Sequence, residues 1–249
     1  MRDLSTTVVA VTGASRGIGA AVARRLGAAG ARVYICGRDK QALDEVARGG
    51  DGLHPMVVDI RNEQAVQDWM DAIEDREGGL DILINNAGIL GPRATLVETD
   101  AAAWRETLEI NATGTFLVTR AAFPLLQDSA EPLVINLSSS VGRVGRGRWG
   151  AYSVSKFAVE GIAEVAADEL ADHGGCVVTL NPGGTATDMR AEAYPDEDPS
   201  TLPSADEIAA TVEVLVRGLT AAQNKAKYSS RELFDLVGQA VVGEEIPQD

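Results

Sequence analysis

Short apolar runs alternate with longer helical stretches along the chain. Seven of the runs are rich in β-branched or aliphatic residues and have the length that is typical of strands. They are Thr7–Val11, Arg32–Cys36, Met56–Ile60, Ile82–Asn85, Leu133–Leu137, Val177–Leu180 and Glu232–Leu236. Because most of them are followed by a helical stretch, the pattern predicts an α/β fold. In such a fold, helices cover both faces of a doubly wound, seven-stranded parallel sheet.

Ordinary start and stop signals bound the helical stretches. They are Gly17–Ala29, Asp39–Arg48, Glu63–Arg76, Asp100–Leu126 and Ala205–Leu219. Asn62 can cap the third of these helices, and Ser204 with Glu207 makes a capping box ahead of the last. Asn111 and Gly114 lie in a segment of poor helix propensity inside the fourth helix. We therefore expect the backbone to be irregular there.

The least regular segment of the chain is Gly183–Pro203, which contains three prolines and five acidic residues. A segment of this length without periodicity inside a compact domain is usually a functional loop. We predict that residues 184–203 form a mobile substrate lid; the alternative is a disordered surface excursion. Elsewhere the sequence has no linker, repeat or low-complexity segment, so a single domain is expected over residues 1–249.

The composition bears on whether the protein enters a membrane and on its cellular compartment. The apolar fraction is 45%, but no apolar run approaches the ~18 residues that a membrane-spanning helix needs. The apolar run near the N-terminus, TVVAV, is too short for a secretory signal. Cys36 and Cys176 lie in or beside predicted strands, where buried free thiols of a reducing compartment are expected. These features predict a soluble, cytoplasmic protein without a membrane partner.

The formal net charge of −15 argues against a nucleic-acid partner, because binding to phosphates needs a basic surface. The acidity fits adaptation to a salty environment, and it equally fits an ordinary well-solvated surface. The two histidines, His54 and His173, have no ligand-like neighbours in the sequence. No metal site is therefore expected.

A glycine-rich segment, TGASRGIG at residues 12–19, follows the first predicted strand and leads into a helix. Glycines allow a tight turn and let a pyrophosphate approach the backbone N–H groups at a helix N-terminus. The spacing is Gly-x-x-x-Gly-x-Gly rather than Gly-x-Gly-x-x-Gly, so a plain tight turn is the alternative. The strand, loop and helix in this order favour a dinucleotide-binding site.

The second predicted strand ends at Cys36-Gly37-Arg38. In folds of this type, an acidic residue near this position binds the adenine ribose hydroxyls and suits NAD. Here Arg38, helped by Arg16, can instead pair with the 2′-phosphate of NADP through charge-assisted hydrogen bonds. The sequence therefore predicts NADP(H) over NAD(H), unless Arg38 is simply a solvated arginine at a strand end.

Tyr152 and Lys156 stand four residues apart, and Ser139 precedes the tyrosine by thirteen residues. If the chain is helical from Gly150, the phenol and the ammonium project from one face, one turn apart. The ammonium then favours phenolate over phenol, and a phenol with a lowered pKa can exchange a proton with a substrate hydroxyl or carbonyl. Taken alone, the pair also fits a helix with one buried aromatic and one solvated lysine.

Together these motifs resemble the short-chain dehydrogenase/reductase family over nearly the whole chain. The resemblance rests on TGASRGIG (12–19), Val58-Asp59, NNAG (85–88), Asn111, the set Ser139, Tyr152 and Lys156, and Asn181-Pro182-Gly183 with Thr185 and Thr187. Three longer stretches, SSSVGR, WGAYSVSKFA and NPGGTATDMRAEAYPDEDP, further resemble a bacterial YciK-like subgroup of oxidoreductases. The family has a Rossmann-type fold, which agrees with the fold class that the strand pattern predicts.

The resemblance also implies a role for each residue of the catalytic set. Tyr152 would be the general acid in carbonyl reduction and the base in alcohol oxidation. Lys156 would lower the pKa of Tyr152 and hydrogen-bond the nicotinamide ribose. Ser139 would hold the carbonyl oxygen, and Asn111 would position a water that links Lys156 to solvent.

The family's cofactor contacts map onto eighteen positions of this chain. The implied contacts are Gly13, Ser15, Arg16, Gly17, Ile18, Gly19, Arg38, Asp59, Ile60, Asn86, Ala87, Gly88, Tyr152, Lys156, Pro182, Gly183, Thr185 and Thr187. Two positions depart from the family pattern. Thr185 stands where an aliphatic residue is common, and the predicted last strand, in SSRELFDL, lacks the glycine that usually precedes it.

The sequence therefore predicts an NADPH-dependent oxidoreductase that reversibly reduces a small ketone or aldehyde to an alcohol. A 3-oxoacyl-thioester reductase is an alternative, since Arg143, Arg146 and Arg148 could favour an anionic carrier; three solvated arginines on a turn are the simpler explanation. An alternative of another class is a catalytically silent NADP(H)-binding sensor. The resemblance also implies a homotetramer or homodimer, built on the helices that carry Asn111 and Tyr152.

Overall fold

The computed structural model describes residues 1–50 and 52–234, and within them seven strands form one parallel sheet. The strands are β1 (Val8–Thr12), β2 (Arg32–Gly37), β3 (Leu53–Val57), β4 (Ile82–Asn85), β5 (Leu133–Leu137), β6 (Cys176–Asn181) and β7 (Lys227–Ser229). Their order across the sheet is β3-β2-β1-β4-β5-β6-β7. This order is doubly wound, since the chain runs outward in both directions from β1, and it confirms the predicted fold class.

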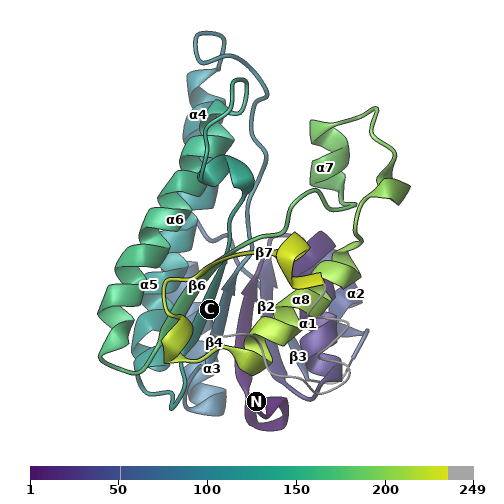
Figure 1. Cartoon of the computed structure of the whole chain (residues 1–249). Helices are drawn as coiled ribbons and strands as arrows, with labels where there is room; N and C mark the ends of the chain where they lie inside the picture. Colours follow the sequence, from purple (N-terminus) through teal and green to yellow (C-terminus); the bar gives the residue numbers. More distant parts are fainter. Residues whose placement is uncertain (51, 235–249) are drawn as a thin grey trace.

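Helices cover both faces of the sheet (Figure 1). They are α1 (Gly17–Ala28), α2 (Lys40–Ala47), α3 (Glu63–Glu77), α4 (Ala101–Leu108), α5 (Gly114–Gln127), α6 (Gly150–Ala171), α7 (Asp188–Ala193) and α8 (Ala205–Gly218). Alternate residues of β1 enter different cores. Val9 and Val11 pack with α1, α2 and α8, whereas Val8 and Ala10 pack with α3, α5 and α6. The twofold side-chain period of a strand thus builds both layers.

The predicted long helix, Asp100–Leu126, is interrupted as expected. α4 ends at Leu108, a single π-helical turn spans Glu109–Thr113, and α5 begins at Gly114. π-turns inside α-helices often mark functional sites. Asn111 lies in this turn and is fully buried. The weak helix propensity of the segment therefore coincides with a real change in the backbone.

The last strand was predicted in the wrong place. β7 is Lys227–Ser229, and residues 230–234 are helical, so the predicted strand Glu232–Leu236 is wrong in its described part. Residues 235 and 236 lie outside the described residues. β7 is short and polar, and its pairing with β6 rather than an apolar pattern makes it a strand. Leu233, whose hydrophobicity suggested the strand, packs into the core from the helical turn.

The third strand begins three residues before the predicted Met56–Ile60. β3 is an edge strand that pairs only with β2, in a register that matches Leu53 to Val33. One of its faces is exposed, so its apolar pattern is weak at the start. Val58 and Ile60 are buried beyond the end of the strand, which explains why the apolar run suggested a later one.

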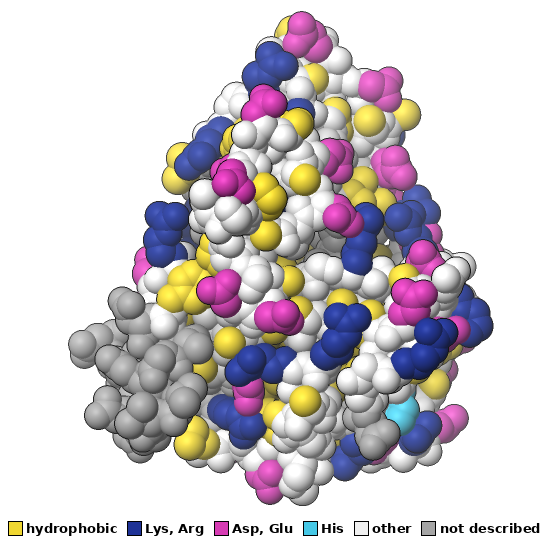
Figure 2. Space-filling model, turned by 90° about the vertical axis from the view of Figure 1, so that its right-hand side faces the viewer, with side chains coloured by type: hydrophobic (Ala, Val, Ile, Leu, Met, Phe, Trp, Pro, Cys, Tyr) yellow, Lys and Arg dark blue, Asp and Glu magenta, His cyan; other side chains and the backbone are white. Residues whose placement is uncertain are grey.

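The positions of the cysteines and of the charged side chains agree with what the composition predicts. Cys36 and Cys176 are buried free thiols on β2 and β6. On the face shown in Figure 2, basic and acidic side chains are interspersed, without a continuous basic patch. In the part of the chain that the structure describes, no helix is both long enough and apolar enough to span a bilayer.

Candidate active site

A cavity of about 660 Å³ opens at the carboxyl ends of the central strands. Because β1 lies between β2 and β4, the chain winds in opposite directions on the two sides of β1. The cavity lies beside the loops that follow β1 and β4, at this change of direction, which is where doubly wound sheets bind ligands. Its walls come from these loops, from the ends of β2, β5 and β6, and from α6 and α7.

The glycine loop after β1 packs directly against the segment that follows β4. Gly13 has a φ of +66°, and a Cβ there would lie 2.6 Å from the Cα of Ala87. The amide of Asn86 donates to the carbonyl oxygens of Thr12 and Gly13, at 2.9 and 3.0 Å. The hydroxyl of Thr12 in turn accepts from two backbone N–H groups of the NNAG segment. Only glycine fits this close approach, so the motif has a steric reason.

The N-terminus of α1 is suited to a phosphate. α1 begins at Gly17, and the residue that precedes it, Arg16, makes no capping hydrogen bond with its side chain. The first N–H groups of a helix lack intrahelical acceptors and carry a partial positive charge. Ser15, Gly17 and Ile18 line the cavity at this point. The site therefore fits the pyrophosphate of a dinucleotide.

Two arginines lie where the adenosine end of such a ligand would be expected. Arg38 lines the cavity just beyond the end of β2, and Arg16 lines it from the glycine loop. Asp59, also in the lining, receives hydrogen bonds from the guanidinium of Arg61, at 3.0 and 3.1 Å, which lowers the pKa of its carboxyl. Asp59 is thus already paired, while a phosphate could approach Arg38.

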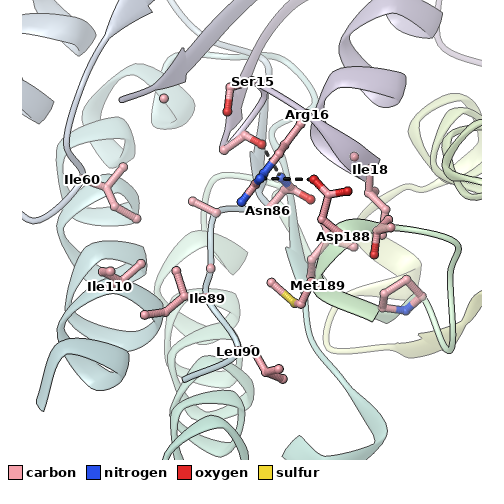
Figure 3. Close-up of a pocket in the computed structure, with 18 of the residues that line it drawn as sticks. Ser15, Arg16, Ile18, Ile60, Asn86, Ile89, Leu90, Ile110, Asp188 and Met189 are labelled. Atoms are coloured by element: carbon pink, nitrogen blue, oxygen red, sulfur yellow. Dashed lines mark hydrogen bonds and ion pairs between the residues drawn. The ribbon is translucent and has the colours of Figure 1, made fainter. Parts of the chain in front are cut away.

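Arg16 is paired with the lid. Its Nη1 lies 3.1 Å from an oxygen of Asp188, and the two side chains point toward each other across the cavity (Figure 3). Both side chains are 77% exposed, so the ion pair contributes little to stability. Arg16 can therefore exchange Asp188 for another anion at small cost.

An apolar wall completes the cavity, and part of it was not predicted from the sequence. Ile60, Ile89 and Ile110 lie together on one side, and Leu90 and Met189 are further along (Figure 3). Apart from Ile60, the motifs did not single out these residues. The sequence held one signal for them: they stand directly after NNAG, directly before Asn111 or at the start of the lid helix. The other unpredicted lining residues are Gly37, Val58, Leu137, Ser138, Ala186, Asp188 and Glu192.

Tyr152 and Lys156 both line the cavity from the first turns of α6. Lys156 is only 5% exposed, and its ammonium donates to the carbonyl oxygen of Leu137, at the end of β5, over 2.6 Å. The same nitrogen lies 5.8 Å from the centre of the Tyr152 ring. The helix therefore brings the pair together as predicted, and the lysine is buried rather than solvated.

Asn111 joins three elements next to Lys156. Its side-chain oxygen accepts from the N–H of Ile89 at 2.8 Å, and its amide donates to the carbonyl of Ile89 and to the hydroxyl of Ser155, both at 2.9 Å. A Cβ on Gly88 would lie 3.2 Å from that oxygen and 3.8 Å from the lysine nitrogen. Asn111 and Lys156 thus flank the same glycine.

Ser139 ends the apolar run of β5 and begins a 3₁₀ turn. Its hydroxyl accepts from the N–H of Val141 at 3.4 Å and is near enough to the phenol of Tyr152 to act on the pKa of that group. Of the three consecutive serines, Ser138 lines the cavity, whereas Ser139 is not in its lining but lowers the pKa of the phenol. The structure therefore brings Asn111, Ser139, Tyr152 and Lys156 to one place.

The pKa values show what burial does to this pair. Burial raises the pKa of Tyr152 to about 12, against the interaction with Ser139, which lowers it. Burial lowers the pKa of Lys156 to about 8, against the negative charge of Glu160, which raises it. The expectation that Lys156 depresses the pKa of Tyr152 is not met in this geometry. The ammonium is directed to the Leu137 carbonyl, and desolvation of the phenol outweighs its charge.

Three predicted cofactor contacts do not line the cavity. Gly19 packs against the side chain of Asn86, so its role is to allow the loop and α1 to approach each other. Gly183 has a φ of +72° and donates its N–H to the side chain of Asn181 at 3.0 Å. Thr185 is buried at 3% exposure, and its hydroxyl has no partner among the described residues. The remaining predicted contacts, Pro182 and Thr187 included, line the cavity.

The segment predicted as a lid contains regular secondary structure. Residues 184–203 contain α7 and a 3₁₀ turn, Pro199–Thr201, and α7 projects from the rest of the molecule (Figure 1). Arg190 and Glu197 form a bidentate ion pair within it, at 2.5 and 2.6 Å. Its mobility remains a prediction.

Comparisons with known proteins agree with this geometry. The family model described as short chain dehydrogenase matches residues 7–198. The chain is 38% identical over 206 residues to the uncharacterized oxidoreductase YciK of Escherichia coli K12, covering 80% of this chain and 81% of that protein.

Two crystal structures are also similar to it. A short chain dehydrogenase of Shigella flexneri 2a, complexed with NADP, has a TM-score of 0.86 and 34% identity, with 93% of this chain and 100% of that chain covered. One from Escherichia coli CFT073, complexed with NADPH, also has a TM-score of 0.86 and 34% identity, with 92% and 98% covered.

The burial of Lys156 predicts how stability depends on pH. Its pKa falls from 10.5 unfolded to about 8 folded, so between these values the unfolded chain binds a proton that the folded chain lacks. The contribution of Lys156 to stability is therefore smallest below about pH 8 and rises up to about pH 10.5. Relative to Lys156→Met, we expect the wild-type free energy of unfolding to rise by about 2–3 kcal/mol from about pH 7 to about pH 10.

Urea denaturation at the two pH values measures this difference. Lys225→Met is the matched control, since Lys225 is exposed and pairs with Asp168, and it should give a much smaller change with pH. A pH-independent difference between wild type and Lys156→Met would show that the lysine is not desolvated.

Proposed function

The chain belongs to the short-chain dehydrogenase family, and on that premise we propose that it is an NADP(H)-dependent oxidoreductase that interconverts a ketone or aldehyde with an alcohol. One observation carries the proposal. Tyr152 and Lys156 line the same cavity as the glycine loop and the N-terminus of α1. A proton donor therefore lies beside a site that fits a dinucleotide phosphate.

When bound, the nicotinamide cofactor supplies the hydride, and the protein supplies orientation and protons. Tyr152 donates the proton from its hydroxyl to the carbonyl oxygen of the substrate. With a pKa of about 12 the phenol is protonated near neutral pH, which is the state that a general acid requires. Ser139, which acts on the pKa of the phenol, offers a second hydrogen bond to the same oxygen and stabilises the charge that develops there.

Lys156 and Asn111 support the proton transfer. With a pKa of about 8 the lysine can both hold and release a proton near neutral pH. It therefore suits resupply of the tyrosine, and it also suits a hydrogen bond to the nicotinamide ribose. Asn111 holds the π-turn against the loop after β4, and we propose that it positions a water between Lys156 and solvent.

The preference for NADP(H) is carried by Arg38 and Arg16. Both line the cavity, and Arg16 can exchange the exposed carboxylate of Asp188 for a phosphate. Similar enzymes from Shigella flexneri and Escherichia coli were crystallised with NADP and NADPH, which supports the assignment. The remaining contacts would be the predicted ones that line the cavity. Buried free thiols support the cytoplasm as the compartment.

The two alternatives have less support. For a 3-oxoacyl-thioester reductase, Arg143 should be available to an anionic carrier, but it donates to Glu160 at 3.1 Å and to Thr179 at 3.1 Å. Arg146 and Arg148 remain exposed. A silent sensor would have no need of the proton relay that Asn111, Ser139, Tyr152 and Lys156 are proposed to form. Tight NADPH binding without turnover of any carbonyl in a panel would favour the sensor.

An apolar stripe on α6 supports a homodimer or homotetramer. Val154, Phe157 and Val165 are 44% to 58% exposed, and their spacing places them on one side of the helix. Phe116 on α5 is also 45% exposed. α6 carries Tyr152, and α5 follows the turn that holds Asn111, so these are the helices on which assembly was predicted.

Replacing Tyr152 by Phe removes the proposed proton donor. We expect carbonyl reduction to fall by at least about a hundredfold, with NADPH binding, followed by nucleotide fluorescence, unchanged. Tyr228→Phe, on β7, is the control and should keep full activity. Persistent turnover by Tyr152→Phe would refute the assignment.

Replacing Arg38 by Ala removes a cation from the proposed 2′-phosphate site. The KM for NADPH should rise about 10-fold or more, as expected for the loss of a charge-assisted hydrogen bond, while the KM for NADH changes little. Steady-state kinetics with both cofactors measure this, with Arg48→Ala as a control outside the cavity. Equal effects on the two cofactors would contradict the proposed preference.

Replacing Phe157 by Glu puts a charge in the apolar stripe of α6, and burying that charge in an interface is costly. We expect light scattering to give a smaller assembly for this variant than for the wild type. Val57→Glu, on the edge strand β3, is the control. A monomeric wild type would exclude the proposed assembly.

A further inference from the structure

The guanidinium of Arg93 lies against two neighbouring aromatic rings near the proposed proton donor. Its Cζ is 4.0 Å from the centre of the Trp149 ring and 5.2 Å from that of Tyr194. The Trp149 ring is in turn 5.9 Å from the ring of Tyr152, centre to centre. The loop after β4, the start of α6 and the lid therefore meet at one cation, which is one aromatic ring away from Tyr152.

Arg93 has hydrogen-bond donors without acceptors. Its Nη1 donates to the carbonyl oxygen of Ala193 at 2.9 Å, while its Nε is buried and has no partner among the described residues. Within residues 1–50 and 52–234, no carboxylate forms an ion pair with it. A buried N–H without an acceptor is unfavourable. Nη2, unlike Nε, is not fully buried and has no hydrogen bond among the described residues, so it is the donor that a carboxylate can approach.

A second arginine on the same ring shows the contrast. The Cζ of Arg190 lies 3.9 Å from the centre of the Tyr194 ring, a distance similar to that between Arg93 and Trp149. Its Nε and Nη2, however, both donate to Glu197. The lid thus supplies a carboxylate for Arg190 and none for Arg93.

The surroundings of Arg93 favour the binding of an anionic group at this arginine over other positions in the site. Glu192, on the lid helix, lines the cavity and would repel an anionic substrate that met no compensating cation. The two rings beside Arg93 are apolar and partly buried, which strengthens a charge-assisted hydrogen bond relative to water. A simple latch between Arg93 and the lid would use the bond to Ala193 and the stacking, but it would leave the guanidinium charge without an anionic partner among the described residues.

We propose that Arg93 binds a carboxylate of the substrate, so that the enzyme acts on oxo acids and the corresponding hydroxy acids. The inference rests on the proposed function, since it places the carbonyl at Tyr152. Because an aromatic ring separates Arg93 from Tyr152, the two groups of the substrate must be several carbons apart, which excludes 2-oxo acids.

The reaction leaves the carboxylate unchanged. The carbonyl carbon gains a hydride from NADPH, which becomes NADP⁺, and the carbonyl oxygen gains a proton from Tyr152, which is later replaced from solvent. Arg93 thus acts on the orientation of the substrate and takes no part in the transfers.

A matched pair of substrates tests the proposal. We compare kcat/KM for 5-oxohexanoate and its methyl ester, with NADPH, in the wild type, Arg93→Met, Arg93→Lys and Arg190→Met. Arg93→Met should lower the value for the acid about tenfold or more and that for the ester less than about twofold. Arg93→Lys should recover part of the loss. Arg190→Met should not distinguish acid from ester, and 2-oxohexanoate should be a poor substrate.

Each other outcome has a defined meaning. An equal loss for acid and ester in Arg93→Met would show a latch and overturn the proposal, as would a wild type that does not prefer the acid. If Arg93→Met does not fold, Arg93→Gln, which can keep the bond to Ala193, replaces it.

Binding separates this proposal from the proposed function. If the wild type turns over neither compound, the proposed function fails, and calorimetry with 5-oxohexanoate decides on the carboxylate site. Binding that is lost in the Arg93 variant supports the site, whereas equal binding or no binding by the wild type overturns it.

Discussion

The buried ammonium of Lys156 is the interaction on which the site depends. A charged nitrogen at this depth is stable only with a hydrogen-bond acceptor, and the Leu137 carbonyl at the end of β5 provides one at 2.6 Å. The backbone must make room for the side chain. A Cβ on Gly142 would lie 2.7 Å from the Cβ of Lys156, and one on Gly88 would lie 3.8 Å from its nitrogen. Gly142 thus allows α6 to approach the turn after β5, whereas a Cβ on Gly88 would only be in ordinary contact with the lysine.

A second buried charge keeps the surrounding turn in place. Glu160, one turn after Lys156 on α6, accepts from Arg143 at 3.1 Å and from Thr179 on β6 at 3.1 Å. Arg143 also donates to the backbone of Tyr228 at 3.2 Å. The turn that follows Ser139 is therefore fastened to α6, β6 and β7, so the serine has a fixed position relative to the phenol. Arg143, considered from the sequence as an anion-binding residue, has this structural role instead.

Four arginines in or near the cavity differ in their partners. Arg143 and Arg190 are paired with glutamates, Arg16 has an exposed and weak partner, and Arg93 has no carboxylate partner among the described residues. Removing a guanidinium from water is unfavourable unless an anion pairs with it. An arginine that already has a carboxylate partner therefore gains little from an anionic ligand, whereas an unpaired one gains most. The arginines that lack a carboxylate partner, rather than the total number of arginines, therefore indicate where an anionic ligand can bind.

The sequence by itself determined the fold class, the glycine loop and the identity of the candidate catalytic residues, because each depends on local patterns. Central strands are buried on both faces and so read as apolar runs, and the glycines after β1 are required by the close approach of two loops. The irregularity at Asn111 was also visible, since the segment has poor helix propensity.

Only the tertiary structure decided the rest. β7 exists through its pairing with β6, which no local pattern contains, and Leu233 was misread because its burial comes from a contact distant in the sequence. The pKa of Tyr152 depends on how far the fold removes the phenol from water, so a spacing of four residues could not predict its direction. Arg93 stands in no motif, and its partners, Trp149 and Tyr194, lie far along the chain. Long-range packing alone brings that cation and those rings together.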